Sequence, residues 1–269
     1  MRRGWFLPIA ALIGFVFLYA PIISLVVFSF NESRLVTVWS GFSTKWYGEL
    51  LADPQMLGAA WLSLRIAAIS ATIALVLGTL CAIALVRFRR FRGRTALAGM
   101  VSAPLVMPDV ITGLALLLLF VGMEGLFGWP AGRGMLTIIL AHSTFCMAYV
   151  CVVVQSRLAD FDMSLEEAAM DLGATPARVF FDITLPIIAP ALVSGWLLGF
   201  TLSLDDLVIA SFVSGPGSST LPMVIFSKVR LGVSPDVNAL ASIIIGTVVL
   251  GVLSATLVQL RSRPKKARG

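Results

Sequence analysis

The chain has 269 residues, of which 58% are hydrophobic and only 13% are charged. Soluble domains carry about 25% charged residues, so this composition excludes an ordinary soluble protein. The net charge of +6 does not indicate a nucleic-acid partner, because the basic residues lie in short segments between long apolar runs. We therefore predict an all-α membrane protein surrounded by lipid.

Long apolar runs predict about six membrane-spanning helices, because a helix needs roughly 20 apolar residues to cross a bilayer. The runs lie at 7–29, 60–86, 97–121, 135–156, 187–213 and 239–260. Prolines inside these runs, such as Pro21, Pro104, Pro108 and Pro190, are tolerated better in spanning helices than in soluble ones. The first run is too long for the apolar part of a signal peptide, so we expect an uncleaved helix.

The distribution of Lys and Arg predicts that both termini face the cytoplasm. In this orientation 14 basic residues lie in inside segments and five in outside segments, with Arg65 near the entrance of a span. An excess of basic residues marks the cytoplasmic side of membrane proteins. The even number of predicted spans agrees with this orientation.

The predicted outside segment 31–58 contains Trp39, Trp46 and Tyr47. Trp46 and Leu50 are four residues apart and share one face of a helix, which predicts a short amphipathic helix at the membrane surface. An aromatic belt is the alternative explanation, and the better one for Trp39 and Tyr47. Trp46 is also a candidate for the substrate path.

The inside loop at 157–186 is the longest and predicts two short helices. Ser164 and Glu167 have the spacing of a capping box, and Gly173 is well placed to end the first helix in a left-handed conformation. Thr175-Pro176 then provides the N-cap and first residue of a second helix. The loop predicts a compact docking surface, and a plain helical hairpin between spans is the alternative.

Within this loop, Glu167-Ala168-Ala169, Gly173 and Ile183-Thr184-Leu185-Pro186 meet the spacing EAA-x3-G-x9-I-x-L-P. This pattern resembles the EAA loop of ABC importer permeases. The resemblance implies a MetI-like type I importer fold with a cytoplasmic coupling loop that docks into a separate ATPase. The implied coupling residues are Glu166, Glu167, Ala168, Ala169 and Gly173.

The sequence lacks a phosphate-binding loop of its own. None of its four lysines follows a glycine, as the pattern G-x-x-x-x-G-K-[ST] requires. We therefore expect no cofactor bound by this chain, and ATP to be used by the partner ATPase.

Three aspartates, Asp109, Asp205 and Asp206, lie inside predicted spans. A charge at mid-helix costs at least ~2.5 kcal/mol, so it suggests a function. In a continuous helix Asp205 and Asp206 diverge by about 100° and cannot face one point, whereas Ser203 and Asp206 share a face. We predict a path for a cation that includes these aspartates and Ser203. Structural contacts between helices are the alternative, although only Arg65 is available as a basic partner.

A narrower resemblance extends over nearly the whole chain. The segments Pro104–Ile111, Ser203–Leu207, Ser214–Gly217 and Gly232–Ala241 are similar to the second permease of bacterial spermidine/putrescine importers, and most to the putrescine type. The resemblance implies a location in the bacterial inner membrane, a homologous permease partner, two ATP-binding subunits, a periplasmic polyamine-binding protein and alternating access. It does not separate putrescine from spermidine or another small cation.

A membrane-embedded enzyme or metal site is not predicted. The cysteines lack metal-ligand spacing and are expected to pack as small hydrophobes, and His142, the single histidine, is expected to be a helix-contact residue. The sequence also lacks H-E-x-x-H and G-x-S-x-G. The cysteines are Cys81, Cys146 and Cys151.

We divide the chain into 1–58, with the first span and outside segment, a permease core at 59–260, and a basic tail at 261–269. In the core, Gly195 and Gly199 are four residues apart, which allows close approach of the companion permease or of another span. A secondary transporter or channel that works alone is the second hypothesis for function, but it does not explain the EAA spacing.

Overall fold

A computed structural model describes residues 5–34, 38–88, 90–231 and 235–262. Residues 263–269 of the predicted basic tail and residues 232–234 of the segment Gly232–Ala241 lie outside this part. The described residues form helices and loops, with one isolated bridge between Asn31 and Phe42. The predicted all-α fold is confirmed.

Five helical stretches of the described part are long and apolar enough to span a membrane. They are α1 (Phe6–Phe28), α3 (Pro54–Arg87), α5 (Asp109–Phe127), α6 (Met135–Ala159) and Pro176–Asp205, which ends in α9 (Leu185–Asp205). In addition, α12 (Pro235–Ser262) contains a shorter apolar stretch, Pro235–Leu250. The prediction of about six spanning helices is confirmed.

The chain divides into two compact units, Met1–Leu57 with Ile225–Gly269, and Gly58–Val224. We refer to them as the terminal unit and the central unit. The first boundary lies next to the predicted one at 58, but α12 groups with the N-terminal segment rather than with the helices of the predicted core.

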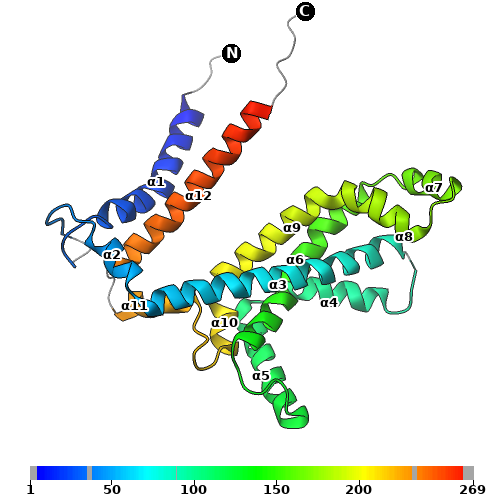
Figure 1. Cartoon of the computed structure of the whole chain (residues 1–269), viewed down its shortest axis with the longest axis horizontal. Helices are drawn as coiled ribbons and strands as arrows, with labels where there is room; N and C mark the ends of the chain where they lie inside the picture. Colours follow the sequence, from blue (N-terminus) through cyan, green and yellow to red (C-terminus); the bar gives the residue numbers. More distant parts are fainter. Residues whose placement is uncertain (1–4, 35–37, 89, 232–234, 263–269) are drawn as a thin grey trace, which may run out of the picture. The chain divides into compact units, whose positions relative to one another are not determined.

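In the terminal unit, α1 and α12 run side by side (Figure 1), and α2 (Lys45–Leu51) packs against α12. Trp46 and Leu50 are both buried, so the predicted short helix with one buried face is confirmed, and its location at the membrane surface stays a prediction. Lys228 of α11 (Leu221–Leu231) pairs with Asp53 at 2.8 Å and with Asp236 at 2.7 Å. The hydrogen bond from Lys228 holds the pKa of the Asp53 carboxyl below its ordinary value.

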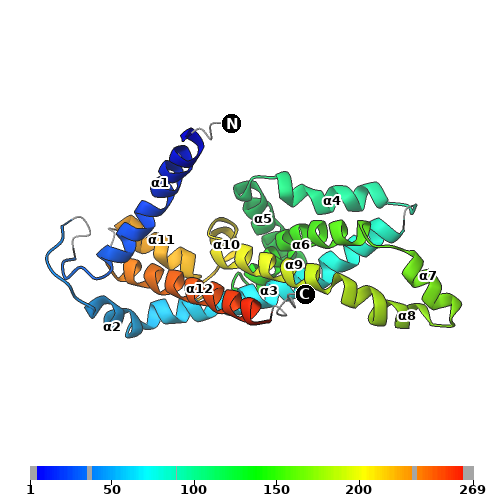
Figure 2. The same ribbon diagram turned by 90° about the horizontal axis from the view of Figure 1, so that it is seen from above.

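In the central unit, α6 is the spanning helix with the largest buried share. It packs against α9, α4 (Arg94–Val106) and α10 (Val208–Val213) (Figure 2). A Cβ added at Gly195 would lie 3.4 Å from Val150 of α6, and one at Gly199 would lie 3.7 Å from Ala71 of α3. The two glycines therefore admit other spans of this same chain.

Two short helices, α7 (Ser164–Asp171) and α8 (Pro176–Val179), follow α6 (Figure 1). The predicted end at Gly173 is confirmed, since its φ of +87° lies in the left-handed region that glycine adopts readily. The predicted start at Thr175 and Pro176 is also confirmed. From α8 the chain continues through a π-helical turn, η1 (Phe180–Thr184), into α9.

The predicted capping box of Ser164 and Glu167 is wrong. Ser164 is already the first helical residue, and no side-chain cap comes from it. Instead the carboxylate of Asp162 accepts a hydrogen bond from the Ser164 backbone N–H at 3.0 Å. A carboxylate two residues earlier thus does the capping, since it reaches an N–H that the helix leaves without a partner.

Two of the predicted spans are interrupted, which corrects the prediction of continuous helices at 97–121 and 187–213. The first consists of α4 and α5, which are separated because Pro108 lacks an N–H and its ring holds Met107 in an extended conformation. The second ends as α9 at Asp205 and resumes as α10 after Asp206, which has an extended backbone with φ −65° and ψ 126°.

The close packing of α3 on α6 predicts an effect of Gly78→Ala. A Cβ at Gly78 would lie 2.9 Å from the carbonyl oxygen of Met147 and 2.9 Å from Val150. Overpacking costs about 1–3 kcal/mol, more than the gain of about 1 kcal/mol in helix propensity. We expect Gly78→Ala to lower the midpoint of thermal unfolding of the purified transporter.

The matched control is Gly99→Ala in α4, where a Cβ would meet no atom within 4 Å. Its midpoint should be unchanged or higher. Equal midpoints for the two variants would contradict a tight contact between α3 and α6.

Candidate functional site

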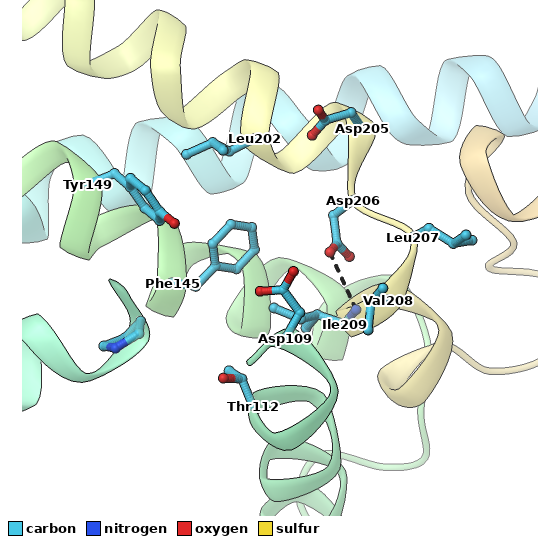
Figure 3. A pocket seen from close by; sticks show the side chains of 11 residues that line it. Asp109, Thr112, Phe145, Tyr149, Leu202, Asp205, Asp206, Leu207, Val208 and Ile209 are labelled. Atoms are coloured by element: carbon cyan, nitrogen blue, oxygen red, sulfur yellow. Dashed lines mark hydrogen bonds between the residues drawn. The ribbon is translucent and has the colours of Figure 1, made fainter. Parts of the chain in front are cut away.

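The two helix interruptions of the central unit border one cavity of about 340 Å³ (Figure 3). Non-helical backbone is tolerated inside a membrane only where protein buries it or where it lines a cavity. The α4–α5 interruption, the α9–α10 interruption and one face of α6 supply the lining residues. They are Pro104, Asp109, Thr112, Phe145, Tyr149, Leu202, Asp205, Asp206, Leu207, Val208 and Ile209.

A glycine holds the two interruptions close together. Gly113 lies one turn into α5, and a Cβ there would be 2.7 Å from the ring of Phe212 and 3.3 Å from the Cα of Ile209. Since α10 carries both neighbours, the absent side chain lets α10 contact α5 directly. The start of α5 and the start of α10 are thereby brought to the same cavity.

Asp206 is engaged by backbone and by a histidine. Its Oδ2 accepts a hydrogen bond from the N–H of Ala210 at 2.7 Å, and its Oδ1 one from Ile209 at 3.4 Å. These are among the first N–H groups of α10, which a helix leaves without partners. The Nε2 atom of His142 lies 3.2 Å from the same Oδ2. Asp206 therefore caps α10, and its side chain is only 9% exposed.

His142 also contacts Ser203. The imidazole is fully buried, and its Nδ1 shares a hydrogen bond of 2.7 Å with the Ser203 hydroxyl. Ser203 and Asp206 thus meet the same histidine, but Ser203 does not line the cavity. The prediction of His142 as a helix-contact residue is confirmed. Its link to the aspartate was missed, and the only signal was that a buried imidazole requires polar partners.

Asp109 and Asp205 have a different environment. Both are exposed and line the cavity, and neither pairs with a basic side chain of the described residues. Arg65 is exposed on α3 and belongs to none of the ion pairs that the described part forms. The prediction that Asp205 and Asp206 cannot face one point is wrong, because α9 ends at Asp205 and the helical angle no longer applies.

The electrostatics of the cavity suit an organic cation. Three carboxylates line it, and Lys and Arg are absent from its described lining. The C-terminal end of α9 adds partial negative charge, because the last carbonyls of a helix lack partners. Phe145 and Tyr149 offer ring faces, to which ammonium groups are attracted. The N-termini of α5 and α10 have partial positive charge, and the carboxylates of Asp109 and Asp206 lie at these two ends and offset it.

The predicted coupling residues divide into two groups. Glu167, Ala168 and Gly173 are exposed, and Ala169 is half-buried. Glu166 differs, because its carboxylate accepts hydrogen bonds from Arg87 and Thr184 and its side chain is only 13% exposed.

Trp46, the remaining residue predicted for the substrate path, belongs to the terminal unit and does not line this cavity. It is 3% exposed, and its indole N–H donates to the carbonyl of Asn31 at 2.6 Å. It borders a separate cavity of about 340 Å³ together with Glu49 and Asp53. Its part in transport stays a prediction.

Residues 74–268 match a known family, the "Binding-protein-dependent transport system inner membrane component". The chain belongs to this family. Members are inner-membrane components of transport systems, so the multi-pass inner-membrane assignment and the resemblance to importer permeases are confirmed.

Two relatives within the transport family are close in sequence. Over 268 residues, covering all of this chain and 94% of the relative, the chain is 63% identical to the "Putrescine transport system permease protein PotI" of Escherichia coli (strain K12). Over 258 residues, 96% of this chain and 93% of the relative, it is 44% identical to the "Spermidine/putrescine transport system permease protein PotC" of the same organism.

A solved structure shows the same fold. A chain of the bacterial ABC transporter involved in import of the acidic polysaccharide alginate superposes with a TM-score of 0.70, over 98% of this chain and 99% of that chain. Because the sequences are only 18% identical, the likeness concerns the fold alone. It confirms the predicted ABC importer permease fold.

The environment of Asp206 predicts a structural role for its carboxylate. Asp206→Ala should lower the midpoint of thermal unfolding of the purified transporter, because loss of a helix cap costs about 1 kcal/mol and the 3.2 Å contact with His142 Nε2 is lost. Asp205→Ala is the matched control and should leave the midpoint unchanged. If both variants unfold at the same temperature, the capping role of Asp206 is wrong.

Proposed function

We propose that the chain is the permease subunit of an ATP-driven importer and forms, with a homologous permease, the path by which putrescine enters the cytoplasm. The observation that carries this proposal is the cavity that Asp109 and Asp205 line without a basic partner among the described residues. The 63% identical relative is named for putrescine transport, which supports this substrate.

The chemistry of putrescine fits the cavity. The molecule has two primary ammonium groups, which stay charged at neutral pH as a lysine side chain does, joined by a short methylene chain. Asp109 and Asp205 offer one carboxylate for each ammonium, while Phe145 and Tyr149 contact the methylene groups. Charge-assisted hydrogen bonds would offset the loss of hydration.

Spermidine or another small cation is the alternative substrate, and the relative that is 44% identical is named for spermidine and putrescine. A transporter or channel working alone is less well supported. The loop that contains α7 exposes apolar side chains, with Leu172 90% and Phe181 62% exposed, as expected of a surface that another subunit covers.

The partners follow from this function. We propose that the loop at 157–186 is cytoplasmic and docks one of two ATP-binding subunits, which use the ATP. A periplasmic polyamine-binding protein delivers the substrate to the periplasmic side of the pair formed by this chain and the companion permease. The permease itself carries out no chemical reaction.

The cavity predicts the effect of removing its free charges. Asp109→Asn and Asp205→Asn keep side-chain size but lose the charge. A hydrogen bond to a charged group contributes about 1.5–3 kcal/mol, and 1.4 kcal/mol corresponds to a factor of ten. We expect each variant to reduce putrescine uptake roughly tenfold, measured in vesicles that contain the whole transporter and loaded binding protein.

The matched control is Glu124→Gln, which removes a charge from the same helix as Asp109 but outside the cavity lining. Its uptake should equal that of the wild type. Wild-type uptake in both aspartate variants would exclude this cavity from the path. Loss of uptake together with loss of assembled complex would favour the alternative in which the aspartates only hold helices together.

The proposed orientation predicts which loops a membrane-impermeant maleimide can reach. In a variant whose native cysteines are replaced by alanine, Phe42→Cys should be labelled in intact cells, because residue 42 faces the periplasm. Arg92→Cys should be labelled only after the cells are opened. The reverse pattern would refute the orientation and the docking role of 157–186. The native cysteines are Cys81, Cys146 and Cys151.

A further inference from the structure

A cluster of three side chains joins the coupling helix to two membrane helices. Arg87, the last residue of α3, donates to both carboxylate oxygens of Glu166 in α7, each at 2.5 Å. The hydroxyl of Thr184 in η1 donates to the same carboxylate. The Arg87 guanidinium also lies 5.3 Å from the ring centre of Phe161, just before α7. One carboxylate thus connects three helical segments.

The cluster differs from an ordinary surface ion pair. The side chains of Arg87 and Glu166 are only 15% and 13% exposed, and the paired geometry is bidentate, which adds direction as well as energy. Burial raises the pKa of the Glu166 carboxyl, but the hydrogen bonds from Arg87 and Thr184 outweigh burial and hold the pKa below its ordinary value. The pair is therefore fully charged at neutral pH.

Apolar packing beneath α7 is incomplete. A cavity of about 400 Å³ lies beside the cluster, between Ile83 of α3, Met170 of α7 and Val179 of α8. The contact between α7 and α3 therefore depends on the polar cluster more than on close-packed side chains. The packing of α7 against α8 and η1 is local to its own loop.

Both segments that Glu166 holds lead into the core around the acidic cavity. Thr184 directly precedes α9, which ends at Asp205 in the cavity lining. The helix that Arg87 ends, α3, contacts α6 through the hydrogen bond from Ser70 to Ile139 and approaches α9 at Ala71. Glu166 is thus bonded to the end of α3 and to the residue before α9, and both helices pack against α6.

We propose that Arg87, Glu166 and Thr184 form a positioning cluster that transmits movement of α7 to α3 and α9, so that Glu166 acts inside the permease and not on the surface that meets the ATPase. The inference rests on the proposed function, in which α7 docks the ATPase. It assigns to Glu167 and Ala168, which are exposed, the contact with the partner.

The main test separates coupling from assembly. Glu166→Gln and Arg87→Met should leave the amount of assembled transporter and its ATP hydrolysis near the wild type, but reduce putrescine uptake per ATP roughly fivefold or more. The charge-reversed double variant, Arg87→Glu with Glu166→Arg, should recover most of this ratio. Such recovery is expected because uptake per ATP depends on the ion pair between residues 87 and 166 and not on either residue alone.

The matched control is the neighbouring pair Arg178 and Asp182 on the same loop. Its side chains are 76% and 63% exposed and 3.3 Å apart, and exposed pairs contribute little. Arg178→Met and Asp182→Asn should keep the wild-type ratio. A wild-type ratio in Glu166→Gln and Arg87→Met, no recovery in the double variant, or loss of the ATPase from the complex would each overturn the proposal.

A second readout does not depend on the substrate. Thr112→Cys, in a background without native cysteines, places a label in the cavity. Its rate of modification should differ between the nucleotide-free and the vanadate-trapped transporter, and Glu166→Gln should abolish this difference. One outcome separates the two proposals. If wild-type vesicles take up no putrescine, the proposed substrate is wrong. The positioning cluster is still supported if the modification rate differs between the two nucleotide states and Glu166→Gln abolishes that difference. A difference unaffected by Glu166→Gln overturns the cluster.

Discussion

Inside a bilayer an unpaired backbone N–H or C=O costs several kcal/mol, and this constraint decides where the helices of the central unit can stop. Each of the two interruptions has its own solution. Between α4 and α5, Pro108 has no N–H, so the interruption leaves one donor fewer to satisfy, and its carbonyl accepts from the N–H groups of Ile111 and Thr112. Between α9 and α10, the carboxylate of Asp206 accepts from the free N–H groups of α10. Both interruptions border one cavity, and the carboxylates of Asp109, Asp205 and Asp206 lie at the helix ends that line it.

The same constraint gives different roles to three aspartates. Asp206 is committed to α10 and to His142, which Ser203 fixes from the other side. With the α9–α10 interruption stabilised in this way, Asp205 is the last residue of α9 and turns to the cavity, opposite the start of α5 at Asp109 (Figure 3). The position of Asp205 at the cavity therefore depends on the buried contacts of Asp206. Among the described residues, Asp109 and Asp205 line the cavity without an ion pair, whereas Asp206 contacts His142.

Sequence reasoning was successful where the controlling interactions are local. Run length predicted the number of spans, and the spacing around Gly173 predicted both helices of the loop at 157–186 and the family. The interruptions were missed because hydropathy does not distinguish one long helix from two short ones, although Pro108 and a capping Asp206 were visible. The contacts between His142 and Ser203, 61 residues apart, and between Arg87 and Glu166, 79 residues apart, depend on tertiary packing that no local pattern contains.

The loop and the cavity are connected by continuous helix. The stretch Pro176–Asp205 has 30 residues, and at 1.5 Å per residue it extends about 45 Å. It begins next to the docking loop and ends at an aspartate of the cavity. The α9 part of this stretch packs against α6, and close-packed interiors transmit strain. The π-helical turn at Phe180–Thr184 is the irregular part of this stretch, and such turns occur frequently at functional sites. Thr184 ends that turn and donates to Glu166, so the contact with α7 lies where the stretch changes from π-helical to α-helical geometry. In the proposed coupling, movement of the loop enters α9 at Thr184 and reaches Asp205 at the other end of the helix.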